Sequence, residues 1–344
     1  MRRLFGAIVL SSCIGAAAAQ QKDDGAEMAE VARLAPQSLL LDLARAGHRI
    51  VAVGERGHVL LSDDEGINWR QASTVPTRDL LTAVCFADAG HGIAVGHDEV
   101  ILTTRDGGAN WIRTHFAPEA QQPLLDVWCG GTKAIAVGAY GAYYTSEDQG
   151  ATWKARRLDA KPLLSAGPRG SKEEGSSEDE LGGDPHLNRI AAASPSRFYV
   201  AGEAGHLYRS DDSGSTWVQL LSPYTGSFFG LLPLDGDALL VYGLRGHLFR
   251  SDDGGKSWAA VKTDTIAMLN DAVRIDAKTI AVAGLAGALL ESHDGGRSFE
   301  QRHQLGRKGL SAVLAVDSSG GADEVVVVGE GGVRRIVLAE EGAP

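Results

Sequence analysis

The sequence predicts an all-β protein, a seven-bladed β-propeller whose blades are four-stranded antiparallel sheets. A block of about 20 residues, exemplified by IVAVGERGHVLLSDDEGINW, recurs along the chain at nearly constant spacing. Each copy contains short β-branched and apolar runs separated by Gly, Asp or Asn turns, which is the pattern of short strands. Helical repeats of this length would need an apolar period of about 3.6 residues, and the sequence has none.

Composition narrows the class of protein further. The chain has 344 residues, of which 44 are Gly, 33 are Lys or Arg and 44 are Asp or Glu, and 44% are hydrophobic. This hydrophobic content is too high for a disordered chain. The formal net charge of −11 argues against a protein that binds nucleic-acid phosphates, so we expect no nucleic-acid partner. No run of about 18 apolar residues is present, so we expect no direct membrane span.

A glycine that ends the first strand of each block marks the repeat. These glycines lie 41 to 45 residues apart, except for one interval of 64 residues, and they are Gly54, Gly96, Gly138, Gly202, Gly243, Gly284 and Gly329. The long interval contains residues 165–186, a polar and acidic stretch that we expect to be a disordered surface insertion. The predicted propeller domain spans residues 30–338, followed by a tail at 339–344.

The two ends of the repeat array predict how the ring closes. The seventh copy, VVVVGEGGVRRIVL, stops before the turn motif, so its blade lacks a fourth strand. The segment EVARLAP, residues 30–36, precedes the first inner strand at the offset where other units have their outer strand. We therefore expect this N-terminal segment to be the outer strand of the last blade, which would leave no exposed sheet edge at the junction.

The first residues have the pattern of a secretory signal peptide. Arg2 and Arg3 precede an apolar run, and three alanines at 17–19 form a small-residue cleavage site. We expect a signal peptide at 1–19, a flexible linker at 20–29, and export to the periplasm or a lumen. The alternative is a lipoprotein anchored at Cys13, because residues 10–13 read Leu-Ser-Ser-Cys.

Two further cysteines would remain in an oxidising compartment after export. Cys85 and Cys129 occupy aligned positions in the predicted inner strands of adjacent blades. Neighbouring strands near the axis could approach the limit of about 7 Å between Cα atoms for a disulfide. Two buried free thiols are the simpler expectation, and the disulfide remains the alternative.

Six units share the turn motif Ser/Thr-x-Asp-x-Gly-x-x-aromatic. The Asp carboxylate can accept backbone N–H groups across a tight turn, and the aromatic residue can pack between blades. Calcium binding is the alternative, but the motif lacks the alternating ligands and distal Glu of an EF-hand loop. We expect a structural role and no metal. The residues are Asp64, Asp106, Asp148, Asp212, Asp253 and Asp294, with Trp69, Trp111, Trp153, Trp217, Trp258 and Phe299.

The combination of AVG…G…S-x-DGG-x-x-W repeats with a predicted signal peptide resembles the photosystem II stability and assembly factor family, which consists of Asp-box (BNR-type) propellers. The resemblance covers about residues 30 to 338. It implies a non-enzymatic, monomeric scaffold without a cofactor, which binds a membrane-protein complex or assembly intermediate in the cell envelope. Its functional association would be with photosynthesis, or with another envelope complex.

The candidate partner-binding residues lie in turns that propeller topology places on one face, opposite the Asp-box turns. Arg and Tyr are favoured at recognition surfaces, and those predicted to gather on this face are Arg56, Arg78, Tyr140, Tyr224, Arg245, Arg307 and Lys308. The acidic insertion should emerge on the same face and could act as an electrostatic lid over the basic residues.

A sialidase-like glycoside hydrolase is the alternative function, because Asp-box propellers also occur in that class. The nominated catalytic pair is Tyr224 with Glu203. The chain lacks the early Arg-Ile-Pro stretch that this resemblance would require, and it has no HExxH or CxxC motif. We therefore predict a binding protein and assign no catalytic residue.

Overall fold

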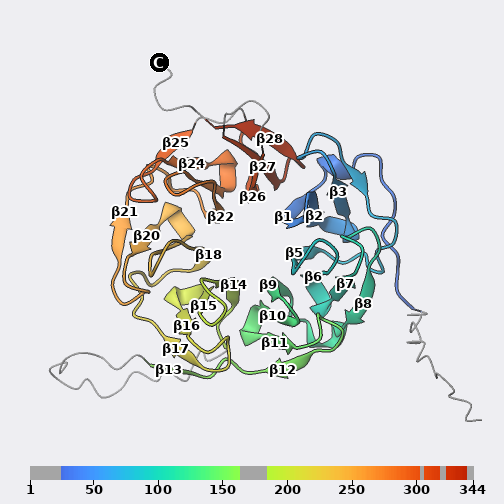
Figure 1. Ribbon diagram of the computed structural model, residues 1–344, viewed down its shortest axis with the longest axis horizontal. Helices are drawn as coiled ribbons and strands as arrows, with labels where there is room; N and C mark the ends of the chain where they lie inside the picture. Colours follow the sequence, from blue (N-terminus) through green and yellow to red (C-terminus); the bar gives the residue numbers. More distant parts are fainter. Residues whose placement is uncertain (1–24, 163–183, 303–305, 318–322, 339–344) are drawn as a thin grey trace, which may run out of the picture.

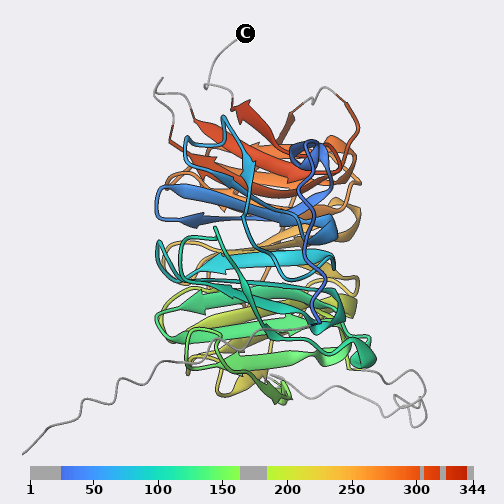
Figure 2. The same cartoon turned by 90° about the vertical axis from the view of Figure 1, so that its right-hand side faces the viewer.

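Seven antiparallel sheets surround a central axis in the computed structural model, which describes residues 25–162, 184–302, 306–317 and 323–338. The sheets follow one another around the ring in the order of the sequence, as the view along the axis shows (Figure 1). The predicted seven-bladed propeller is confirmed, and we number its blades 1 to 7 in chain order. The side view shows the strands of successive blades stacked across the ring (Figure 2).

Blades 1 to 3 contain four strands each, from the axis outward. Blade 1 consists of β1 (Leu40–Ala46), β2 (Arg49–Gly54), β3 (Val59–Ser62) and β4 (Arg70–Gln71). Blade 2 consists of β5 (Leu81–Phe86), β6 (Gly92–Gly96), β7 (Ile101–Thr104) and β8 (Ile112–His115). Blade 3 consists of β9 (Leu124–Gly130), β10 (Lys133–Gly138), β11 (Tyr143–Ser146) and β12 (Lys154–Arg156).

Blades 4 to 7 vary in strand number. Blade 4 consists of β14 (Leu187–Ala192), β15 (Phe198–Gly202), β16 (Leu207–Ser210) and β17 (Trp217–Gln219), and β13 (Ala160–Pro162) pairs in parallel with β17. Blade 5 consists of β18 (Phe228–Pro233), β19 (Leu239–Gly243), β20 (Leu248–Ser251) and β21 (Ala259–Val261). Blade 6 consists of β22 (Leu269–Arg274), β23 (Ile280–Gly284), β24 (Leu289–Ser292) and β25 (Glu300–Arg302). Blade 7 consists of β26 (Leu310–Val316), β27 (Glu324–Gly329) and β28 (Arg334–Val337).

Short 3₁₀ helices occupy turns between the strands. They are η1 (Ala35–Gln37), η2 (Glu55–Gly57), η3 (His97–Glu99), η4 (Pro118–Ala120), η5 (Ala139–Gly141), η6 (Glu203–Gly205), η7 (Leu244–Gly246) and η8 (Leu285–Gly287). Among the residues that the structure describes, no helix has the length and apolar character needed to cross a membrane.

The hydrophobic core lies between neighbouring blades. Side chains alternate along a strand, so Val51 and Val53 of β2 pack toward blade 2 while Ile50 and Ala52 pack toward blade 7. Because both faces of each blade are covered, the second strands read as continuous apolar runs such as IVAV rather than as alternating patterns. The second strand is buried on both faces in every blade. The same apolar run is therefore needed in each unit, and this makes the repeat visible in the sequence.

The predicted closure of the ring by an N-terminal strand is wrong. Blade 7 is a three-stranded sheet, and the described N-terminal residues form no strand. They run along the outside of blades 1 and 2 instead (Figure 1), where the Ala29 N–H donates to Val75 O and the Ala32 N–H donates to Gln71 Oε1. Pro36 has no N–H to contribute to a sheet, and it lies in η1, where its carbonyl accepts the Val333 N–H of blade 7 at 2.9 Å.

Blades 1 and 7 therefore meet through buried side chains and η1. Ala35, Leu40 and Ile50 pack with Val326 and Val328 in one apolar cluster. This contact joins the two ends of the array without a shared sheet.

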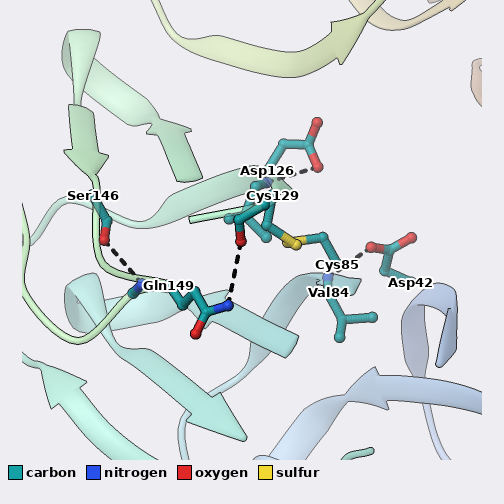
Figure 3. The surroundings of a disulfide bond; sticks show 10 residues. Asp42, Val84, Cys85, Asp126, Cys129, Ser146 and Gln149 are labelled. Atoms are coloured by element: carbon teal, nitrogen blue, oxygen red, sulfur yellow. Dashed lines mark hydrogen bonds between the residues drawn. A yellow bond between two sulfur atoms is a disulfide. The ribbon is translucent and has the colours of Figure 1, made fainter. Parts of the chain in front are cut away.

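A disulfide links blades 2 and 3. Cys85 in β5 and Cys129 in β9 are bonded, with a Cα–Cα distance of 5.9 Å, so the expectation of two free thiols is wrong. The aligned positions of the two residues put them at the same height on adjacent inner strands, within bonding range. Figure 3 shows the bond between the inner strands, close to Asp42 and Asp126.

Several sequence-based predictions fall outside the described residues. These are the signal peptide and Cys13, residues 20–24 of the linker, most of the acidic insertion, and the C-terminal tail. They remain predictions.

Candidate partner-binding face

The two faces of the ring are built from different turns. On one face, the Asp-box turns of blades 2 to 6 bond to the turn that joins the first two strands of the same blade, as in the Gly254 N–H to Asp237 O bond of blade 5. On the other face, the 3₁₀ turns meet the linkers between blades, as in the Gly57 N–H to Asp79 O bond of blade 1. We call these the Asp-box face and the linker face.

The Asp-box turns use their carboxylates internally. In blade 5, Asp253 Oδ1 accepts the Ser251 hydroxyl at 2.8 Å and the Ser257 N–H at 2.9 Å, and Oδ2 accepts the Ser257 hydroxyl at 2.6 Å. These bonds, led by that from the Ser257 hydroxyl, lower the pKa of Asp253 to about 2. The same Ser/Thr-to-Asp bond recurs in all six copies. The geometry is that of a structural turn.

The aromatic residue of the motif fastens the turn to its surroundings. Trp111 is 2% exposed, and its indole N–H donates to Gly108 O at 2.8 Å. In blade 5, the Trp258 indole donates instead to Leu221 O of the preceding linker. Among the described residues, no three His, Cys, Asp or Glu side chains gather to hold a metal ion.

The linker face is shaped by glycines at close backbone contacts. A Cβ on Gly54 would lie 2.2 Å from Leu39 O, and one on Gly246 would lie 2.1 Å from Thr265 O. Between such glycines the tip of the turn adopts left-handed backbone angles, with φ of 56° at both Arg56 and Arg245 and 53° at Tyr140. Because the same conformation recurs at Ala204 and Ala286, the fold itself requires it, and the side chain at the tip is displayed outward.

Four predicted basic residues are exposed on the linker face and have no partner among the residues that the structure describes. Arg56, Arg245, Arg307 and Lys308 form no ion pair and no side-chain hydrogen bond within the described part of the chain. They come from the turns of blades 1 and 5 and from the linker that leads into blade 7. They therefore lie along one arc of the ring, from blade 5 through blades 6 and 7 to blade 1 (Figure 1).

Several arginines at the Asp-box end of the blades form ion pairs instead. Arg49 pairs with Asp63 at 2.6 Å, and Arg274 pairs with Asp235 through both of its terminal nitrogens. Six arginines at that end each form an ion pair with Asp or Glu: Arg45, Arg49, Arg197, Arg209, Arg250 and Arg274. These guanidinium groups hold turns together, whereas the three arginines and one lysine of the arc form no such pair within the described residues.

The other predicted binding residues do not join the arc. Arg78 is engaged by the N-terminal segment, donating to Met28 O at 3.0 Å and to Glu30 at 2.8 Å. Tyr140 lies on blade 3 and contacts the His186 ring edge-on, with centroids 4.7 Å apart. Tyr224 lies flat against His247 beside Arg245. The seven residues thus share a face but divide into an unpaired basic arc and separate contacts.

The nominated hydrolase pair is not assembled. Glu203 accepts the backbone N–H of His186 at 2.8 Å, and its other oxygen lies 3.8 Å from the His186 ring. Tyr224 packs against His247 and Phe228 instead. No catalytic arrangement of Tyr, Glu and Arg is formed by these residues.

Sequence reasoning missed an ionic cluster on the inner strands. Arg189 of β14 donates to Asp271 of β22 at 2.7 Å and lies 3.5 Å from Asp126 of β9. Asp42 of β1 accepts the Val84 N–H from the neighbouring blade at 2.8 Å. Burial raises the pKa of Asp42 to about 7, although the positive charge of Arg189 opposes the shift.

This cluster does have a sequence signal. The third residue of the inner strand is charged in four blades, at Asp42, Asp126, Arg189 and Asp271. Aligning the repeats shows that these side chains share one level of the ring. The Asp side chains reach backbone N–H groups of the next inner strand, at Val84, Ile190 and Val313. Their role is to join blades.

A second missed feature is the buried carboxylate of Glu99. Glu99 is 2% exposed and has a φ of 52°, at a turn position that is glycine in the other six blades. Its Oε2 accepts the Tyr144 hydroxyl at 2.7 Å and lies 3.1 Å from His115 Nε2. The sequence signal was the loss of glycine from the pattern G-x-x-G at this one turn.

Comparisons with known proteins agree with this architecture. Residues 27–177 match the family model described as "Photosynthesis system II assembly factor YCF48". A search of curated protein sequences found no match.

Solved structures with this fold include two structures of YCF48 and a WD40 propeller. One is described as "YCF48 bound to D1 peptide" (19% identity, TM-score 0.66, covering 90% of this chain and 97% of that one). Another is YCF48 from Cyanidioschyzon merolae (17% identity, TM-score 0.64, covering 90% and 98%). The WD40 propeller domain of Doa1 is also similar (12% identity, TM-score 0.66, covering 92% and 98%). At these identities the structural similarity establishes the fold.

Proposed function

We propose that the chain is a non-enzymatic factor that binds a membrane-protein complex or its assembly intermediate, and the match of residues 27–177 to the model of a photosystem II assembly factor supports this. The observation that carries the proposal is the arc of cations on the linker face, formed by Arg56, Arg245, Arg307 and Lys308, which have no partner in the described part of the chain. Unpaired guanidinium groups can form bidentate bonds with carboxylates. The part of the partner bound there would therefore be an acidic segment.

The electrostatics of the molecule favour a local contact rather than general attraction. The whole chain carries a net charge of −11, so a distant acidic partner experiences overall repulsion at low salt. Only a partner segment that reaches the arc gains from its positive charge, because exposed charges are screened beyond about 10 Å at ordinary ionic strength. The arrangement thus favours specific docking on the linker face.

The similar structure described as YCF48 bound to a D1 peptide supports a peptide-like segment as the ligand. We propose that this chain also binds a peptide-like segment, and that the segment belongs to a membrane protein of the cell envelope. The pattern at residues 1–19 supports export to the periplasm or a lumen, where such a segment would be accessible. We propose that the protein acts there as a monomer.

The test is capture of the partner from detergent-solubilised membranes of the host. The variant Arg56→Ala/Arg307→Ala/Lys308→Ala removes three charges of the arc. The matched control Arg105→Ala/Lys256→Ala/Lys278→Ala removes the same number of exposed, unpaired charges from the Asp-box face. We expect the arc variant to lose a membrane protein that wild type and control both retain, and wild-type capture to weaken with salt.

Equal capture by the arc variant would contradict the proposal. A separate assay with a fluorogenic sialoside addresses the alternative hydrolase function, and turnover there would count against a non-enzymatic role.

A further inference from the structure

A groove of about 890 Å³ opens at the outer corner of blade 5, on the linker face. Pro223 and Tyr224 of the linker from blade 4 form one wall. The other wall is formed by residues 260–266, which end β21 and begin the next linker. Leu248 and Phe249 of β20 lie at the base, and Arg245 stands at the rim. The groove thus combines an aromatic and aliphatic interior with an exposed cation.

The aromatic wall is fixed by its neighbours. The Tyr224 ring stacks on His247, with centroids 4.1 Å apart and an interplanar angle of 14°. Gly226 leaves room for this ring, since a Cβ there would lie 2.3 Å from a Tyr224 ring carbon. The Tyr224 carbonyl accepts the Ser222 hydroxyl at 2.6 Å. A rigid aromatic surface of this kind loses little conformational entropy on binding.

The opposite wall carries an apolar side chain with no cover. Ile266 is 89% exposed. Lys262 and Asp264 on the same wall pair with each other at 2.7 Å. Arg245, held at φ 56°, is therefore the charge of the groove that has no partner among the described residues. Its charge complements an acidic ligand.

The groove is also lined by β21, the last strand of its sheet. In blade 4, the linker from blade 3 forms β13 and pairs in parallel with the outer strand β17. In blade 2, the linker residue Thr74 forms a parallel bridge to Asn110. In blade 5, β21 is the last strand of its sheet, and within the described residues no strand pairs with its outer edge. The Trp258 indole beside it donates to Leu221 O of the linker. Unpaired strand edges accept added strands.

We propose that this groove binds an extended acidic peptide segment, which adds to the edge of β21 as β13 adds to β17. An apolar side chain of the segment lies between Tyr224 and Ile266, and a neighbouring acidic side chain pairs with Arg245. The inference rests on the proposed function, because the segment would belong to the membrane-protein partner held by the basic arc. It adds a defined anchoring site and backbone pairing to that function.

The direct test uses a labelled peptide, Thr-Glu-Val-Glu-Val-Thr, with binding followed by fluorescence anisotropy. Three matched probes replace valine with serine, replace glutamate with lysine, or carry N-methyl groups on both valines. We expect the parent probe to bind and all three altered probes to bind more weakly, because they lose the apolar contact, the charge or the backbone pairing. Failure of the parent probe to bind, or full binding of the N-methylated probe, would overturn the proposal.

Variants of the protein localise the site. Ile266→Ser should weaken binding of the parent probe about tenfold, since an apolar side chain loses its partner. The control Ile67→Ser alters an isoleucine that is 65% exposed on the Asp-box face and should leave binding unchanged. Arg245→Ala should weaken binding and reduce its salt dependence. Hydrogen exchange should show new protection at residues 259–261, and protection elsewhere without it would overturn the assignment.

The two proposals fail in distinguishable ways. If the arc variant loses the membrane partner while Ile266→Ser retains it and the parent probe does not bind, the groove assignment is wrong and the proposed function stands. If neither variant affects capture of the membrane partner, the proposed function itself is contradicted.

Discussion

Removing the disulfide between blades 2 and 3 should lower stability substantially. The bond joins residues separated by 44 positions, and closing a loop of that length reduces the entropy of the unfolded chain by the equivalent of about 4 kcal/mol at room temperature. Both cysteines are half-buried at the inner strands, so replacing them with alanine removes little packing. The loss of the cross-link should therefore dominate the effect of Cys85→Ala/Cys129→Ala.

Urea unfolding followed by tryptophan fluorescence measures this loss. If the free energy of unfolding falls by about 3 kcal/mol for each molar of urea, the urea concentration at half unfolding should be about 1 M lower for the double variant than for oxidised wild type. A reductant should bring wild type down to the midpoint of the double variant and leave that variant unchanged. The reasoning would be refuted by equal midpoints for the variant and oxidised wild type, or by two titratable thiols in unfolded, unreduced protein that begins at residue 20.

Other predictions concern titration, backbone contacts and export. Because burial raises the pKa of Asp42 to about 7, the free energy of unfolding should fall as pH rises from about 4 to about 7, by up to about 4 kcal/mol, and Asp42→Asn should flatten this slope in urea midpoints. The pKa of Asp253 is lowered to about 2, so its contribution is present above about pH 4 and is lost as pH falls toward 2; Asp253→Asn should weaken that acid dependence. Gly246→Ala should cost several kcal/mol more than Gly236→Ala, because both have positive φ but only the former meets Thr265 O; thermal unfolding compares them. Mass spectrometry of exported protein should find an N-terminus at residue 20, and a lipid on Cys13 would contradict it.

Much of the fold was predictable because the repeat records the packing geometry. Each blade buries both faces of its second strand, so the same apolar run and closing glycine recur in every unit. The Asp-box turns were predictable for the same reason, since their hydrogen bonds are local. Their role follows from residues within one short stretch.

The ring closure and the candidate site depended on contacts between distant residues. The segment 30–36 resembles a strand in isolation, yet the Gln71 side chain bonds to the backbone of Glu30 and Ala32, and Pro36 lies in a 3₁₀ turn. Arg78 and Arg245 look equivalent in the sequence, but an N-terminal glutamate neutralises the first and leaves the second available. Whether an arginine forms an ion pair therefore depends on which acidic side chains the tertiary structure places next to it.

The sequence by itself determined the number of blades, the position of their turns and the face on which the basic residues would lie, because these follow from a local pattern repeated with a fixed period. Only the tertiary structure decided that Cys85 bonds to Cys129, that Arg189 joins Asp126 to Asp271, and that a groove opens beside β21. Those outcomes depend on distances between residues far apart in the chain, and such distances are set by how whole blades pack against one another.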